Sequence, residues 1–554
     1  MPIFFNLESH LWIAYLLFFN GLLICLWLRS VSLTFADLTR FFESLVVFSF
    51  VASIALNCIV LLVLDLLNIK FIEAVWPIVS VTVIIGFLHC RLFYTNKPFL
   101  RRALTIEWGF LRLVLYSLVF IILFYNGGMI DQLSDAWWHM SLTNKIAIES
   151  AFTPEYGHLT GAPARYYPPL WHSNLALAHL LSGDSIPVLW NSFTAWGGVL
   201  KVMAFYCLSV GLTQNKKMSF VAAFLFVLLP GIGNSYLRVS AWPSHIAYIA
   251  WFLMFFVFFS VIQGLKSSVL SRCEPLRLQD LACSIKEHGL SLFVLLGLTT
   301  VVYFTHQVEV LWFGVACFAY LAASSISRAL SVSECFVVDR DHASLRFVYR
   351  LALTVLVALA SYYVFQNYER SSFDQVLAAA LPMFIVVILL LVEFESVSRT
   401  AKLVLLSCMT ISILVSLNGV HFLSLFFPDM AVPRGAFHES PSSVAGYFGG
   451  ALELPGWHLQ LRSGLLYSGV LAVPLSLVLA VLRPSLMSLF LGGTALLAIT
   501  FCLSPYLYHW LKDLMAYHSP WRITLMIFHP LIFAVCLVDL INYVKRRKAV
   551  SHVN

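Results

Sequence analysis

The sequence predicts an all-α protein that crosses a membrane many times. Of its 554 residues, 60% are hydrophobic and only 11% are charged, a composition far from that of soluble domains. The apolar residues occur in runs about as long as a bilayer-spanning helix, without the alternation of a membrane strand. Because every backbone polar group must be satisfied inside a bilayer, these runs predict membrane helices.

Taken in chain order, the apolar runs predict about fifteen membrane helices. They lie near residues 10–28, 43–66, 72–93, 105–125, 186–212, 218–233, 244–263, 289–304, 309–326, 350–366, 375–393, 402–426, 464–482, 485–503 and 522–543. We divide the chain into a three-helix extension over 1–100, a core over 101–426, an outward loop over 427–463, and C-terminal helices with a basic tail over 464–554.

Basic residues predict the orientation, because cytoplasmic loops collect Lys and Arg. Clusters such as Arg101–Arg102, Lys216–Lys217 and the C-terminal Lys545–Lys548 fall in alternate loops. This pattern predicts an outward N-terminus, a cytoplasmic C-terminus and an outward loop over 127–184, in a plasma membrane that we expect to be bacterial. The segment before the first run has no basic residue, so we expect a retained span and no cleaved signal peptide.

Cysteine positions and net charge add two exclusions. The loop cysteines Cys273, Cys283 and Cys335 all fall on the predicted cytoplasmic side, so no outward disulfide framework is expected. The net charge of +7 is explained by cytoplasmic loops near anionic lipid headgroups, and it gives no reason to expect a nucleic-acid partner.

The outward loop over 127–184 is the longest polar interval in the N-terminal half, and it carries two notable segments, Asp131–His139 and Tyr166–His172. Ser134 is a predicted N-cap for a helix that begins at Asp135 and lies at the membrane interface. A second short helix is predicted from Leu170 to Leu181, started by two prolines and ended by Gly183-Asp184.

These motifs give the region from Arg101 to Lys217 a resemblance to the GT-C superfamily of membrane glycosyltransferases. The likeness lies in Asp-x-Trp-Trp-His at 135–139 and Tyr-Pro-Pro-Leu-x-His at 167–172, each followed by a short outward helix. The resemblance implies a GT-C-like core, a polyprenyl-phosphate or polyprenyl-diphosphate sugar donor, and an essential acidic residue in the first large outward loop. The carboxylate pair usual in that family is split here into Asp131 and Asp135.

The chemistry of sugar transfer outside the cell also requires a carboxylate. A glycosyl donor there arrives on a lipid, and displacing its phosphate needs a base for the acceptor hydroxyl and cationic groups for the phosphate. We assign the base of an inverting transfer to Asp135 and keep Asp131 as its alternative or partner. The structural reading is that Asp135 only supports the first turn of a helix.

Further polar residues of outward segments are candidates for the substrate site. For the donor phosphate these are Arg522, His139, Arg238 and His306, and Arg522 follows a predicted helix start at Ser519-Pro520. For the sugar or the acceptor they are Tyr166, Tyr167, His172, Glu309, His438, Glu439 and Trp457. A divalent metal, Mg²⁺ or Mn²⁺, would be held by Asp135 and His139. Each residue also has a plain structural reading as an interfacial anchor, helix cap or loop residue.

The expected partners are a lipid-linked sugar and a glycan, glycolipid or protein acceptor, and two other functions stay open. A glycan polymerase or ligase that uses lipid-diphosphate sugars would have its catalytic loop late in the chain, where Arg434 and Arg462 lie. A transporter or flippase of glycolipids would need ionisable residues within its spans, and Arg112 and Lys201 are the candidates. A non-catalytic scaffold would not need Asp, His and Tyr concentrated in one loop.

Overall fold

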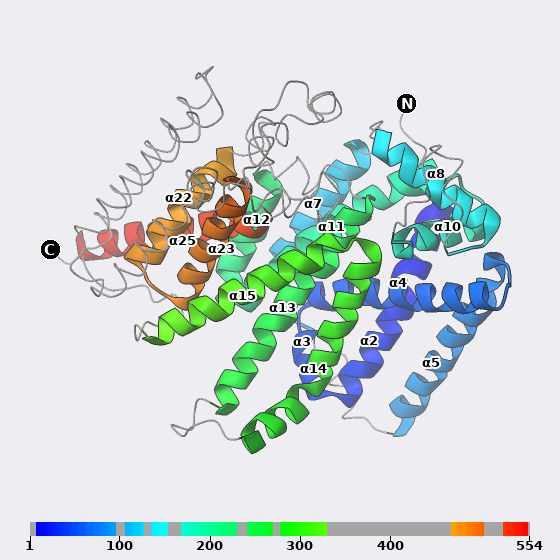
Figure 1. Ribbon diagram of the computed structural model, residues 1–554, viewed down its shortest axis with the longest axis horizontal. Coiled ribbons are helices and arrows are strands. Elements are labelled where there is room, and N and C mark those ends of the chain that lie inside the picture. The colour runs from blue at the N-terminus through cyan, green and yellow to red at the C-terminus, as the bar shows by residue number, and fades with distance from the viewer. Residues whose placement is uncertain are drawn as a thin grey trace, which may run out of the picture. The chain divides into compact units, whose positions relative to one another are not determined.

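The structure is a computed structural model that describes residues 7–95, 106–126, 134–152, 168–229, 241–269, 278–329, 467–503 and 525–551. The described residues are almost entirely helical, and their one extended pairing is an isolated parallel bridge between Phe41 and Glu107. The predicted all-α class is confirmed for this part of the chain (Figure 1).

The chain divides into two compact units, Met1–Lys216 with Ser235–Phe313, and Lys217–Asn234 with Gly314–Asn554. The four segments that we predicted from the sequence stay a prediction. The helices of the first unit are α1 (Leu7–Ala14), the π-helix η1 (Tyr15–Phe19), α2 (Asn20–Val31), α3 (Leu33–Leu38), α4 (Phe42–Leu66), the 3₁₀-helix η2 (Phe71–Ala74), α5 (Val75–Thr95), α7 (Phe110–Asn126), α8 (Ser134–Glu149), α10 (Leu170–Ser182), α11 (Ile186–Thr213), α13 (Pro243–Val269) and α14 (Leu278–Thr305).

The second unit contains fewer described helices. They are most of α12 (Lys216–Leu228), the later part of α15 (Val308–Ala329), α22 (Tyr467–Leu482), α23 (Leu486–Leu503) and α25 (His529–Ser551). The helix α22 packs against both α23 and α25. An ion pair of 2.7 Å between Arg483 and Asp539 joins the α22–α23 turn to α25, and Phe490 of α23 contacts Tyr320 of α15.

Helices long and apolar enough to cross a membrane occur where the sequence predicts them. Within the described residues, five segments meet this criterion: Glu8–Val31, Phe42–Leu66, Phe71–Arg91, Ile186–Thr213 and Pro243–Gln263. Shorter apolar helices lie at six more of the predicted runs, and α12 covers most of the predicted run at 218–233. The predicted runs at 350–366, 375–393 and 402–426 lie outside the described residues.

The helix α11 is the centre of the first unit, and α5 lies on its outside. In the most apolar 18 residues of Ile186–Thr213, which is α11, 94% of the residues are buried. In the corresponding part of Phe71–Arg91, which includes most of α5, only 17% are buried. The exposed side chains of α5 include the large apolar Trp76, Val83 and Phe87. An apolar helix surface of this kind is expected to face lipid, since water would make its exposure unfavourable.

Loop contacts group the helix ends of the first unit into two sets. The backbone of Glu107 bonds to Arg40 (2.8 Å) and Phe42 (3.2 Å), which brings the starts of α4 and α7 together. Elsewhere, Phe71 donates to the hydroxyl of Ser150 (3.2 Å), which joins the α4–α5 connection to the end of α8. The alternation of the loops and their orientation in the membrane stay predictions.

Buried asparagines fix α10 against α4. The amide of Asn57 donates to the carbonyl of Leu16 and to the side-chain oxygen of Asn174, both at 2.9 Å. The π-helix η1 contains Leu16, and its wider turn departs from the regular backbone ladder, so a side chain can bond to a carbonyl there. These bonds hold the short helix α10 deep inside the first unit, where Leu170 through Ala178 are all buried.

Candidate functional site

The first of the two segments in the loop over 127–184 forms the start of α8, which begins at Ser134, one residue before the predicted start at Asp135. Its buried side chains include Ala136, His139, Met140 and Thr143, which recur at helical spacing on one face. Asp135 lies in the first turn, four residues before His139, so the two positions share that side of the helix. The helix therefore carries the candidate base and a buried imidazole one turn apart.

The second segment forms α10, in agreement with the predicted helix over 170–181. Pro169 directly precedes the helix, and its fixed φ angle suits a helix start. Gly183 ends the helix with a φ of 74°. This left-handed conformation costs glycine little and lets its N–H bond to the carbonyl of His179 at 3.0 Å. The sharp end allows α10 to fold back onto α11, so Trp171 lies beside Phe193 with ring centroids 4.6 Å apart.

The two segments meet at a pair of histidines. Nδ1 of His139 and Nε2 of His172 are 2.9 Å apart, a hydrogen-bonding distance. His172 is fully buried, and this burial lowers its pKa from 6.5 to about 3, so the ring is neutral near pH 7. Residues 33 positions apart in the sequence thus form one polar element inside an apolar interior.

Aromatic side chains surround the histidine pair. The ring of Trp190 on α11 stacks on His139 with an interplanar angle of 18° and a centroid distance of 6.3 Å. The rings of Trp138 and Trp242 lie at 5.0 and 6.4 Å from the same imidazole. The indole N–H of Trp171 donates to the carbonyl of Ala241 at 2.6 Å, which ties α10 to the start of α13. Faces of aromatic rings are suited to contact with the apolar faces of sugars.

A buried lysine lies on the other side of Trp242. Nζ of Lys201 is 3.0 Å from Nδ1 of His245, and the His245 ring is 6.1 Å from that of Trp242. The side chain of Lys201 is completely buried although it lies within a candidate membrane span. We predicted Lys201 only as a buried charge of a transporter, and we did not select His245. A lysine within an apolar run was the available signal, but its partner comes from another helix.

The residues His306 and Glu309 form a contact of their own at the turn between α14 and α15. Nδ1 of His306 lies 2.5 Å from a carboxylate oxygen of Glu309, whose side chain is buried. This pairing fits the reading of both residues as helix caps, because it joins two helix ends. The helix α14 also packs against α10, which carries His172.

The remaining predicted site residues lie where the structure gives no description. For Asp135 this applies to the side chain alone. The others lie outside the described residues: Asp131, Tyr166, Tyr167, Arg238, His438, Glu439, Trp457 and Arg522. Within the described part, no three His, Cys, Asp or Glu side chains form a group that could hold a metal ion. The divalent metal at Asp135 and His139 therefore stays a prediction.

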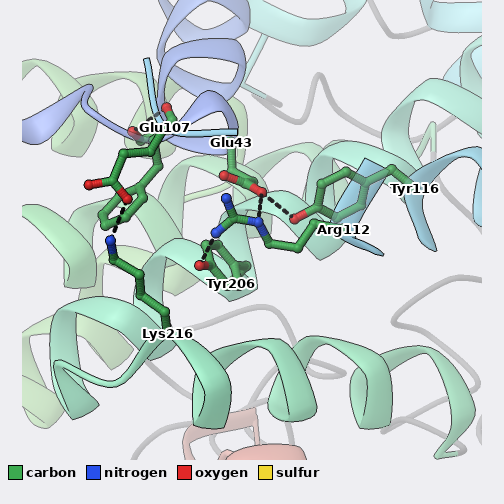
Figure 2. Close-up of polar contacts among 8 residues, drawn as sticks. Glu43, Glu107, Arg112, Tyr116, Tyr206 and Lys216 are labelled. Carbon is green, nitrogen blue, oxygen red and sulfur yellow. Dashed lines mark hydrogen bonds and ion pairs between the residues drawn. The ribbon is translucent and has the colours of Figure 1, made fainter. Parts of the chain in front are cut away.

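A second buried polar cluster joins α4, α7 and α11. Nε of Arg112 lies 2.9 Å from a carboxylate oxygen of Glu43, which also accepts a 3.0 Å bond from the Tyr116 hydroxyl. The same guanidinium donates to the Tyr206 hydroxyl and lies over its ring, 4.6 Å from the centroid (Figure 2). The nearby pair of Glu107 and Lys216 is much more exposed. We predicted Arg112 as a buried charge, but the sequence did not reveal Glu43 as its partner.

Comparison with protein families, with curated proteins and with solved structures gives no match to this chain.

Proposed function

We propose that the chain is a membrane glycosyltransferase that moves a sugar from a polyprenyl-phosphate donor to a glycan, lipid or protein acceptor. The observation that carries this proposal is the contact of His139 with His172. It brings together the two loop segments on which the GT-C resemblance depends, and it does so one turn from Asp135. The rings of Trp138 and Trp242, which are partly exposed, add surfaces that we expect a sugar to contact.

In the proposed reaction, Asp135 takes the proton from the acceptor hydroxyl. The hydroxyl oxygen then bonds to the anomeric carbon, and the bond from that carbon to the phosphate oxygen breaks, with its electron pair leaving on the phosphate. The configuration at the anomeric carbon is inverted. Asp131 is the alternative base. We propose that Arg522, with His139, Arg238 and His306, binds the leaving phosphate.

The remaining parts of the proposal concern location and substrate contacts. We place the site on the outer side of a bacterial plasma membrane, because the loop over 127–184 is outward in the topology that the basic residues predict. Side chains of the two predicted outward loops, together with Glu309 at the α14–α15 turn, would contact the sugar or the acceptor; the loop residues are Tyr166, Tyr167, His172, His438, Glu439 and Trp457. A Mg²⁺ or Mn²⁺ ion held by Asp135 would supply positive charge for the phosphate.

The test is sugar transfer from a synthetic polyprenyl-phosphate sugar by the purified full-length chain in liposomes, with and without a chelator. Asp135→Asn keeps the size of the side chain and removes the proton acceptor, so we expect a loss of ~10²–10⁴-fold in rate. Asp131→Asn is measured in parallel. If Asp135 only supports the helix, its neutralisation costs ~0.3–1 kcal/mol of stability and activity stays near normal. Full activity in both variants would exclude this loop as the catalytic site.

A second candidate function is a transporter or flippase of glycolipids. The observation that favours it is the presence of buried ionisable groups within candidate spans. They are Lys201 beside His245, and Glu43 beside Arg112 of the shorter apolar helix α7. Such groups often mark substrate or ion pathways. Movement of a fluorescent polyprenyl-phosphate sugar across the liposome membrane, without formation of a transfer product, would support this function over the transferase.

A further inference from the structure

A lysine inside a candidate membrane helix lies close to the histidine pair of the candidate site. Lys201 is fully buried within the span Ile186–Thr213, and its ammonium nitrogen is 3.0 Å from Nδ1 of His245. A charged side chain inside a bilayer is costly, and such residues generally mark the path or the site of a substrate. The imidazole of His245 is not an anion, so this contact orients the ammonium and leaves its charge in place.

The fold directs this ammonium toward the two loop segments. Lys201 and Trp190 are eleven residues apart in α11, about three turns, so they lie on the same side of the helix. Cα–Cβ bonds tilt toward the start of a helix, which is the end of α11 that carries Trp190. The ring of Trp190 stacks on His139. The ring of Trp242 lies 6.4 Å from that of His139 and 6.1 Å from that of His245. The ammonium is therefore a neighbour of the aromatic side chains that surround the histidine pair.

The indole of Trp242 supplies a second donor beside His245. The side chain as a whole is partly exposed, but its Nε1 is buried, and the described part of the chain places no acceptor within hydrogen-bonding distance of it. Buried polar atoms rarely lack a partner. The indole N–H and the ammonium of Lys201 can only donate hydrogen bonds. A cation and a donor that are both neighbours of one imidazole are suited to an anionic oxygen.

We propose that Lys201 and Trp242 bind a phosphate oxygen of the lipid-linked donor, the ammonium through an ion pair and the indole N–H through a hydrogen bond. This inference rests on the proposed function, because the donor in that function is a polyprenyl-phosphate sugar. It adds a buried cation of α11 to the phosphate ligands that the sequence predicts. Charge-assisted hydrogen bonds of this kind are about twice as strong as neutral ones, and they stabilise the charge that develops on the leaving phosphate.

The experiment measures binding of the phosphate without any sugar transfer. The purified full-length chain in detergent micelles is incubated with radiolabelled polyprenyl phosphate, and unlabelled polyprenyl phosphate, polyprenol or inorganic phosphate is added as a competitor. We expect polyprenyl phosphate to compete and the other two to compete weakly. Equal competition by polyprenol would show that the phosphate is not recognised. Equal competition by inorganic phosphate would assign the site to free phosphate. Either result would overturn the proposal.

Two variants test the two proposed ligands. Lys201→Met keeps the apolar stem and removes the charge, and Trp242→Phe keeps an aromatic ring and removes the N–H. Each should weaken binding of polyprenyl phosphate about ten-fold or more, because each removes one hydrogen bond to a charged group. The matched control is Lys145→Met, which removes a buried lysine of α8 that pairs with Glu149 at 3.5 Å, and it should leave binding unchanged.

The outcomes separate this site from the proposed function. Trp242→Phe removes a donor without an acceptor among the described residues, so it should fold normally and keeps the test decisive if Lys201→Met does not fold. Wild-type affinity in either folded variant would overturn the proposal. If the expected losses of binding are found but the wild type transfers no sugar in liposomes, the proposed function fails and the phosphate site stands. Sugar transfer with an unchanged KM for the donor in both variants would keep the function and reject the site.

Discussion

Removal of the Arg112 guanidinium should destabilise the first unit strongly. The carboxylate of Glu43 is 1% exposed, and Arg112→Met would leave it buried without its cationic partner, although the Tyr116 hydroxyl would still donate to it. Leaving one charge of a buried pair without its partner typically costs ~3–5 kcal/mol. Replacing both charges, as Arg112→Met with Glu43→Gln, removes the unpaired charge and should cost only about 1–2 kcal/mol.

This double-mutant cycle is measurable by SDS-induced unfolding of the purified chain in detergent micelles, followed by circular dichroism. The control is Lys216→Met, because the pair of Lys216 and Glu107 is similarly short but has side chains that are 55% and 43% exposed. An exposed pair should contribute no more than ~1 kcal/mol. The reasoning is refuted if Arg112→Met costs as little as the control, or if the effects of the two substitutions at the buried pair are additive.

Three further predictions follow from buried contacts of the same unit. A Cβ at residue 109 would clash with Nε of Arg112. Gly109→Ala should therefore lower the free energy of unfolding by ~1–3 kcal/mol in the wild type and by much less in the Arg112→Met variant. Equal losses in the two backgrounds would contradict this explanation. Burial lowers the pKa of His172 to about 3 in the folded chain, so below pH 6.5 the unfolded chain binds a proton that the folded chain does not. The free energy of unfolding should therefore be highest above pH 6.5 and about 2 kcal/mol lower at pH 5. Unfolding at both pH values should show a smaller pH effect in His172→Gln, and an unchanged effect would exclude this cause. Asn57→Leu removes two buried bonds and should cost ~1–3 kcal/mol of unfolding free energy. In an Asn174→Leu background the cost should be smaller, because the Asn57–Asn174 bond is already lost and only the bond to Leu16 remains to be removed.

The sequence by itself determined the helical class, the approximate helix bounds and the short helices of the loop over 127–184. It did so because these features depend on local chemistry. Apolar runs of bilayer length leave a backbone few alternatives to a helix, and Gly183 allows a left-handed turn wherever the chain ends α10. The spacing of Asp135 and His139 on one face of α8 is likewise a local property, since residues four apart in a helix are neighbours.

Only the tertiary structure decided which polar residues are partners. Nothing in the sequence around His172 indicates that it bonds to His139, that Lys201 contacts His245, or that Glu43 pairs with Arg112. These contacts join different helices, and their geometry depends on how long helices pack against one another. The cost of burying a polar group without a partner explains why partners exist. It cannot say which helix supplies each one, because many pairings of distant residues would satisfy the same requirement.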